Sequence, residues 1–100
     1  MEVAILSADP LFVSAATGIA GAMGHSVTRE ASAAEHITIC DVATMESADL
    51  LRGLDPMRTV LFVSRDSRAH LAFLHVYPRT TLALELPRVL ALLAEASAVW

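Results

Sequence analysis

Short apolar runs alternate along this 100-residue chain with segments whose apolar residues recur at helical spacing. Four runs have the length and composition of buried strands, at residues 3–6, 37–40, 60–63 and 82–84. Strands that alternate with helices are typical of a parallel sheet covered on both faces. Because 100 residues suit one compact core, we expect a single domain over residues 1–100. The fold class that the pattern predicts is α/β, with a doubly wound, mainly parallel sheet.

The first helix has clear signals at both ends. Asp9 suits the N-cap, Pro10 suits the first helical position, and Gly24 suits the stop. The apolar stripe that we expect to face the sheet consists of Leu11, Ala15, Ile19, Ala22 and Met23.

Three further helices are expected. Ser47 can cap a short one that ends before Pro56, and Asp66 or Ser67 can cap another that ends near Pro78. The last helix is expected to begin near Pro87. Its inward residues are predicted to be Val89, Leu90, Leu93 and Ala94.

The connection at residues 25–36 is the irregular part of the pattern. Residues 25–29 have strand character, yet only residues 30–36 separate them from the next strand. A parallel crossover that contains a helix needs at least ~10–12 residues. Either the helix between the second and third strands is shortened or missing, or the second strand is absent or lies elsewhere.

Composition narrows the class of protein. Apolar residues make up 55% of the chain and charged residues 18%, which argues against disorder. The net charge is −4, and the seven cations are all arginine and form no cluster, so this domain is not expected to bind nucleic acid by itself.

The single cysteine, Cys40, cannot form an internal disulfide and is expected to be a core residue. No stretch approaches the length of a membrane span, and we expect a cytoplasmic domain.

Polar residues follow the predicted strands in a consistent order. Ser7, Ala8 and Asp9 follow the first, Asp41 ends the second, and Ser64 ends the third. In an open α/β sheet the carboxyl ends of the strands border the ligand crevice. A carboxylate at this place is suited to phosphoryl or metal chemistry, which makes Asp41 the first candidate for a functional residue.

This order resembles the receiver domain of two-component response regulators, particularly those with LuxR- or NarL-type output. The resemblance implies a doubly wound sheet of five parallel strands. It also implies an acidic pair that binds magnesium after the first strand and an aspartate that accepts phosphate after the third. A serine or threonine after the fourth strand and a lysine after the fifth would contact the phosphoryl group.

Carried over residue by residue, the resemblance is partial. Asp41 falls on the phosphoacceptor position and Ser64 on the hydroxyl position, whereas Ser7 and Ala8 stand where the acidic pair is expected. Asp9 comes one place later, where it could hold magnesium weakly, although we expect no resident cofactor. The lysine position falls within residues 84–86, and no placement there recovers a cation.

These departures bear on chemistry, because electrostatic stabilisation is the main tool of phosphoryl transfer. Without the acidic pair and the lysine, phosphorylation of Asp41 is not expected, and no catalytic residue is assigned. Arg65 could supply a cation but is expected to point to solvent. In the simplest interpretation Asp41 is vestigial and caps the following turn through the amides of Ala43 or Thr44.

In the last helix, residues 89–93 are apolar on every side and residues 94–100 are almost uncharged. A helix that is apolar on every side is normally buried on every side. We therefore expect a homodimer that pairs through the last helix and its neighbours. The resemblance to receiver domains also implies pairing through this surface. The candidates for its interface are Val89, Leu90, Leu93 and Trp100. An output domain outside these 100 residues, or a partner protein, could cover the same surface instead.

Three hypotheses follow from the sequence. The first is a degenerate receiver-like regulatory and dimerisation module of a bacterial transcription regulator, independent of phosphate. The second is a working receiver that uses Asp41, Asp9 and Ser64 with an unusual cation. The third is a small α/β ligand-binding domain or enzyme, which ranks last because no nucleophile and base pair and no phosphate-binding glycine loop is found.

Overall fold

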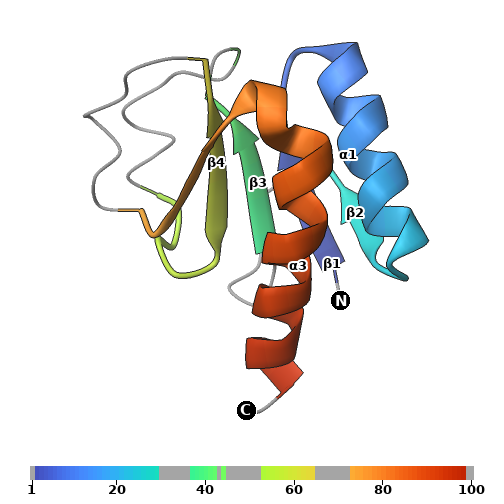
Figure 1. Ribbon diagram of the computed structural model, residues 1–100, viewed down its shortest axis with the longest axis vertical. Helices are drawn as coiled ribbons and strands as arrows, with labels where there is room; N and C mark the ends of the chain where they lie inside the picture. The colour runs from blue at the N-terminus through green and yellow to red at the C-terminus, as the bar shows by residue number, and fades with distance from the viewer. Residues whose placement is uncertain (1, 30–36, 43, 45–52, 65–72, 99–100) are drawn as a thin grey trace.

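The computed structural model describes residues 2–29, 37–42, 44, 53–64 and 73–98. Its centre is a sheet of five parallel strands in the order β2-β1-β3-β4-β5 (Figure 1). This is the strand order of flavodoxin-like doubly wound sheets, so the predicted fold class is confirmed. The strands are β1 (Glu2–Leu6), β2 (Ser26–Thr28), β3 (Ile37–Asp41), β4 (Thr59–Val63) and β5 (His75–Pro78).

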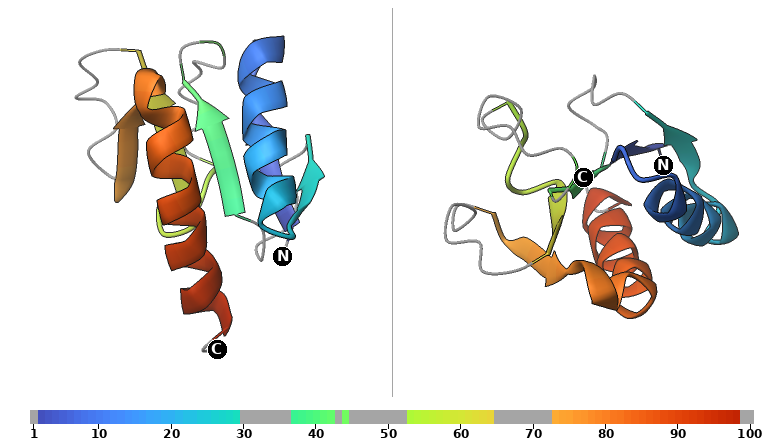
Figure 2. Two further views of the ribbon diagram at one scale, coloured as in Figure 1. Left: turned by 45° about the vertical axis from the view of Figure 1, so that its right-hand side comes forward. Right: turned by 90° about the horizontal axis from the view of Figure 1, so that it is seen from above.

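Two helices are described, α1 (Pro10–Ala22) and α3 (Leu82–Ala98), and a 3-10 turn, η2 (Arg79–Thr81), leads into α3. Both helices lie on the same face of the sheet and pack against each other (Figure 2). Within the described part of the chain, no helix is long and apolar enough to cross a membrane.

The core has two parts because side chains alternate between the faces of a strand. On the helix side, the sheet residues pack with Phe12 and Ala16 of α1 and with Leu86 and Leu90 of α3. The opposite face buries Leu6, Cys40, Val42 and Leu61. The sheet residues on the helix side are Val3, Ile5, Ile37, Ile39, Val60 and Phe62. Burial on both faces explains why these strands read as continuous apolar runs.

The predicted ends of α1 are confirmed. The Asp9 carboxylate caps the helix by accepting the Leu11 N–H at 3.0 Å, and Pro10 is the first helical residue. Gly24 follows the helix with a φ of +84°, a left-handed conformation that glycine adopts at no steric cost.

The predicted stripe of α1 is partly wrong. Ile19 and Met23 are half-buried, but Leu11 is 81% exposed and Ala15 and Ala22 are also exposed. The residues that face the core are Phe12, Ala16 and Ala20. The largest apolar side chain near the start of α1, Phe12, packs edge-on against Phe62 with ring centroids 5.8 Å apart. This contact turns the helix by about one residue, or ~100°, from the predicted orientation.

The last part of the chain also differs from the prediction. Residues 82–84 belong to α3 rather than to a strand, Pro87 lies inside that helix, and His75–Pro78 form the fifth strand instead of continuing a helix. A short apolar run cannot be assigned to strand or helix by periodicity alone. Here Leu82, Leu86, Leu90 and Leu93 recur at helical spacing and are all buried, which is why the run joins the helix.

Of the remaining predicted elements, one lies within the described residues and the others lie mostly outside them. The strand predicted within residues 25–29 is confirmed as β2, at the edge of the sheet beside β1. The connection at 30–36, most of the helix expected after Ser47 and the start of the one expected at Asp66 or Ser67 lie outside the described residues, as does Arg65.

Candidate functional site at the carboxyl ends of the strands

The site lies where the topology of the sheet reverses direction. From β1 the chain crosses to β2 on one side and then returns to β3 on the other side. Such a switch point between the first and third strands is the place where doubly wound sheets of this order bind ligands. Ser7 directly follows β1, and Asp41 is the last residue of β3, so both border this point.

The Asp41 side chain is fully buried, with 0% of its surface exposed. Its Oδ2 accepts hydrogen bonds from the Ser7 hydroxyl at 2.8 Å and from the Thr44 hydroxyl at 3.1 Å. A third donor to the same oxygen is the Arg79 guanidinium, whose Nη2 lies 3.0 Å away. Burial of an ionised carboxylate is costly unless it is paired and hydrogen-bonded, and these donors meet that requirement.

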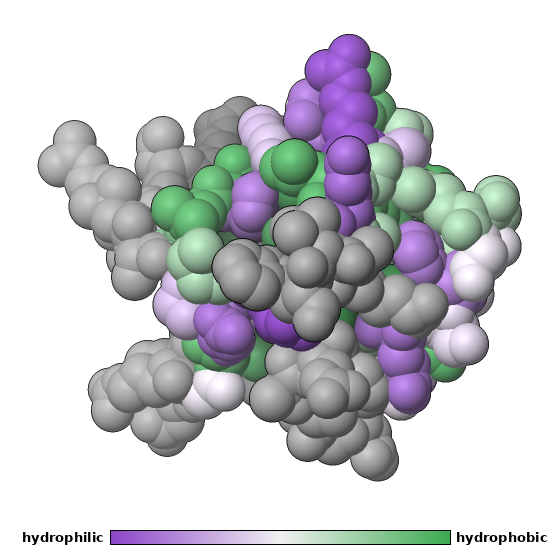
Figure 3. Space-filling model, turned by 90° about the horizontal axis from the view of Figure 1, so that it is seen from below, coloured by the Kyte–Doolittle hydropathy of each residue, from purple (hydrophilic) through white to green (hydrophobic). Residues whose placement is uncertain are grey.

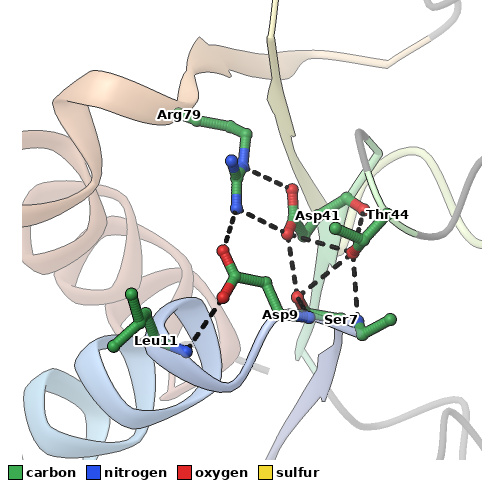
Figure 4. Close-up of polar contacts among 7 residues, drawn as sticks. Ser7, Asp9, Leu11, Asp41, Thr44 and Arg79 are labelled. Carbon is green, nitrogen blue, oxygen red and sulfur yellow. Dashed lines mark hydrogen bonds and ion pairs between the residues drawn. The ribbon is translucent and has the colours of Figure 1, made fainter.

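Arg79 holds two carboxylates at once. Its Nη2 donates to Asp9 Oδ2 at 2.7 Å, and its Nε lies 2.7 Å from Asp41 Oδ1. The second contact is an ion pair whose N–H does not point at the oxygen well enough for a hydrogen bond. Figure 4 shows the guanidinium between the two carboxylates. The three side chains therefore form one charge cluster, here named the Asp9–Arg79–Asp41 triad.

The position of Arg79 depends on the sheet. It directly follows β5, which is separated from β3 by β4. Neighbouring strands lie ~4.8 Å apart, so the Arg79 and Asp41 side chains together must bridge about 10 Å between β5 and β3. The long arginine side chain makes this contact possible, and its guanidinium lies over the Phe12 ring at 5.6 Å from the centroid. Such a cation–π contact helps to fix the orientation of the arginine.

Contacts within the triad shift the pKa values of Asp9 and Arg79. The hydrogen bond from Arg79, assisted by the Leu11 N–H, lowers the pKa of Asp9 below its ordinary value of 3.8. The hydrogen bond to Asp9 and the pairing with Asp41 raise the pKa of Arg79. With both carboxylates ionised, the triad has a net charge of −1.

Hydroxyl and backbone groups complete the cluster. The Ser7 hydroxyl accepts the Asp9 N–H at 3.0 Å, and the Thr44 hydroxyl accepts the Ala8 N–H at 3.0 Å. Since each hydroxyl has one proton, both oxygens can donate to Asp41 while they accept from these amides. The loop after β1 is thereby joined to the turn after β3.

The structure brings together Ser7, Ala8, Asp9 and Asp41, four of the five predicted site residues. Ser64 follows β4 as predicted but is exposed, and no described hydrogen bond joins it to Asp41. The turn after Asp41 also differs in detail from the prediction. The Thr44 amide donates to the Asp41 backbone carbonyl at 3.1 Å, and the Thr44 hydroxyl is the group that contacts the carboxylate.

Two contacts of the site were not predicted, those of the Thr44 hydroxyl and of Arg79. Thr44 stands three residues after Asp41, a spacing at which a side chain can return to a turn. Arg79 occupies the place after the fifth strand where the resemblance implies a cation. It was missed because that strand was predicted at residues 82–84, which moves the expected cation to residues 84–86.

The interface candidates on the last helix require a correction. Val89 and Leu90 are 2% and 0% exposed and Leu93 is 8% exposed, and all three pack in the core on the helix side of the sheet. The prediction that they line a dimer interface is therefore wrong, because the sheet and α1 already cover them. Trp100 lies outside the described residues.

A pocket of about 290 Å³ opens beside the triad. Asp9 and Arg79 supply its charged side, while the apolar part comes from α1 and from the start of α3. Its full lining is Asp9, Leu11, Phe12, Arg79, Thr80 and Leu82. The pocket is of the size that holds a small ligand or one side chain of a partner.

Cys40, next to Asp41, is fully buried on the opposite face of the sheet. Burial and the neighbouring Asp41 charge raise the pKa of its thiol to about 11. A thiol with so high a pKa is a poor nucleophile. The expectation that Cys40 is a core residue is confirmed.

The fold and the site together define an open α/β sheet with a charge cluster at its switch point, in which the Asp41 carboxylate is buried and Asp9 and Arg79 are partly exposed. Comparison of the chain with protein-family models, with curated proteins and with solved structures found no match.

Proposed function

We propose that this chain is a degenerate, receiver-like regulatory and dimerisation module of a bacterial signalling or transcription regulator, and that it works without phosphorylation of Asp41. One observation carries the proposal. The Asp41 carboxylate is fully buried, and both of its oxygens are in contact with Arg79. A phosphoacceptor needs an oxygen that is free to attack phosphorus in line with the leaving group, and Asp41 offers none in this arrangement.

The donor set argues against a resident magnesium ion. Magnesium prefers octahedral oxygen ligation through one or two carboxylates and several waters. The carboxylates at this site are Asp9 and Asp41, and each lies 2.7 Å from a nitrogen of the same guanidinium. An incoming divalent cation would have to displace Arg79 against its positive charge. The residues do not fit magnesium, and we derive no chemical step through it.

In this proposal the guanidinium is a built-in counter-charge. It neutralises Asp41 at all times, whereas a bound metal would do so only when present. Regulation would then come from a protein partner, from pairing of two copies, or from a small ligand in the pocket beside Arg79.

A working phosphoacceptor receiver is the second candidate. The observation in its favour is the same arginine, because a fixed cation next to Asp41 could stabilise a phosphoryl group in place of lysine. Ser7 and Thr44 could donate to the phosphoryl oxygens after a rearrangement. We place this function second because Arg79 is bound to the acceptor oxygens themselves.

The proposal includes a cytoplasmic setting and a C-terminal output domain or a partner protein. Any contact with DNA is assigned to that other part of the regulator. The reason is charge: this chain has a net charge of −4 and no lysine, whereas proteins that bind DNA gather positive charge on one surface.

Incubation with magnesium and beryllofluoride, or with a small phosphodonor, tests the proposal. We expect the intact mass, the tryptophan fluorescence and the oligomeric state of the chain to stay unchanged. Asp41→Asn is the matched control, since it keeps the size of the side chain and removes the acceptor. A gain of one phosphoryl group by the native chain, absent from Asp41→Asn, would establish the second candidate instead.

A further inference from the structure

Helix α3 has an outer face with exposed leucines that the described chain does not cover. Residues of this outer face are spaced at i, i+4, i+7, i+8 and i+11, the periodicity of one side of a helix. All of them are exposed, and two are large apolar residues, Leu84 at 57% and Leu92 at 55%. The outer face consists of Leu84, Arg88, Ala91, Leu92 and Glu95. It points away from the core residues Leu86, Val89, Leu90 and Leu93 of the same helix.

The C-terminal end of α3 is also free of the sheet. A 17-residue helix is about 25 Å long, whereas the five-residue strands span about 17 Å. The last turns of α3 accordingly extend past the strands (Figures 1 and 2). The molecule viewed from below shows apolar and polar surface side by side (Figure 3). The last turns of α3 therefore do not lie over the described strands.

The charges on the outer face are self-complementary. Arg88 and Glu95 are seven residues apart, which places them on the same side of α3 about 10 Å from each other. Among the described residues neither of them makes an ion pair. Between them lie Ala91, which is small enough for close approach of a second helix, and Leu92.

Symmetry decides which arrangement of two α3 helices these residues favour. In an antiparallel pair with Ala91 opposite Leu92 of the second copy, Arg88 falls opposite Glu95 twice. Such an isologous contact is what a twofold axis requires. In a parallel pair, Arg88 would face Arg88 and Glu95 would face Glu95, and like charges that face each other are destabilising.

We propose that the outer face of α3 binds the same face of a second copy of this chain in an antiparallel helix pair, with Ala91 and Leu92 in the seam and Arg88 paired with Glu95 at both ends. This inference rests on the dimerisation in the proposed function and names the surface that carries it. The interface in this inference consists of exposed residues of α3, in place of the buried Val89, Leu90 and Leu93 that the sequence predicted.

Two charge reversals, Arg88→Glu and Glu95→Arg, test the pairing by sedimentation equilibrium. Either variant alone would place like charges opposite each other twice in its own dimer. We expect the dissociation constant of each dimer to rise about tenfold or more, since a change of sign at two pairs removes attractions and adds repulsions of ~0.2–1 kcal/mol each. A 1:1 mixture should restore dimers, because a mixed pair places the two substituted side chains, of opposite charge, against each other and keeps one native pair of Arg88 with Glu95.

Controls separate the possible outcomes. Thermal unfolding by circular dichroism should be unchanged in both variants, and Leu74→Ser, which removes an exposed leucine outside α3, should dimerise like the native chain. A native dimer that the reversals do not weaken, or variants that the mixture does not restore, would overturn the α3 geometry and leave dimerisation standing. A native chain that stays monomeric at all concentrations would overturn both the α3 pairing and the dimerisation in the proposed function, whether or not another protein binds this face. The phosphate independence of Asp41 is tested separately and would be unaffected.

Discussion

Arg79 and Asp41 are 38 residues apart in the chain, yet the guanidinium nitrogens of the first lie 2.7 and 3.0 Å from the carboxylate oxygens of the second. The pair joins the end of β5 to the end of β3 across the intervening strand β4. Through Asp9 it also holds the start of α1. The Arg79 side chain therefore connects the ends of β3 and β5 with the start of α1.

Replacement of Arg79 tests this link. Arg79→Met should lower the free energy of unfolding by about 3 kcal/mol, because it leaves the Asp41 carboxylate buried without a counter-charge. The double variant Arg79→Met/Asp41→Asn should lose less than Arg79→Met alone, since no buried charge then remains unpaired. Urea unfolding provides the measurement, with the exposed Arg88→Met as control. A loss below about 1 kcal/mol for Arg79→Met is typical of an exposed ion pair and would contradict the role of Arg79 as the counter-charge of the buried Asp41 carboxylate.

The same substitution should create a cation site. Without the guanidinium, the Asp9 and Asp41 carboxylates face each other with no charge between them, which is the donor set that divalent cations prefer. Magnesium or manganese at millimolar concentration should raise the melting temperature of Arg79→Met and leave that of the native chain unchanged. Arg79→Met/Asp9→Asn is the control and should respond less. An equal response of the native chain to the metal would contradict the role of Arg79 as the resident cation.

The depressed pKa of Asp9 predicts a defined effect of pH. A carboxyl whose pKa is lower in the folded state stabilises the fold above its unfolded pKa, and this contribution is lost as the pH falls through the lower, folded pKa. The ordinary value is 3.8, so the contribution should be complete at about pH 6 and should disappear well below about pH 4. Asp9→Asn keeps an N-cap residue and removes only the charge. Its melting temperature should be lower than that of the native chain at about pH 6, and the two should converge in acid. A gap that does not close on acidification would mean that the charge of Asp9 contributes nothing.

Neighbouring leucines on α3 should respond in opposite ways to the same substitution. Leu93 is 8% exposed and part of the core, whereas Leu92 is 55% exposed on the outer face. Leu93→Asp should therefore destabilise the domain by about 4 kcal/mol or unfold it. Leu92→Asp should change the stability of the dilute chain by no more than about 0.5 kcal/mol. Chemical unfolding at low protein concentration measures both values, and equal losses would show that the assignment of the two faces of α3 is wrong.

Local pattern was enough to specify several parts of this protein. Apolar runs at residues 3–6, 37–40 and 60–63 predicted three strands correctly, because strands buried on both faces must be apolar throughout. Asp9 and Pro10 specified the start of α1, because they meet the needs of its first turn through neighbours in the chain. Asp41 was found for a similar reason: it ends an apolar run, and the end of a parallel strand is where a ligand crevice forms.

The other parts depended on contacts between distant segments. Residues 82–84 are helical because Leu86, Leu90 and Leu93 continue their spacing against the sheet, and that contact is not visible in a three-residue run. The rotation of α1 is set by the contact of Phe12 with Phe62, which belongs to a strand far along the chain. Arg79 could be assigned to Asp41 only once β5 was placed beside β4, because the contact spans three strands of the sheet. Periodicity reports which way a side chain faces along its own element, whereas the pairing of distant charges depends on how the elements are brought together.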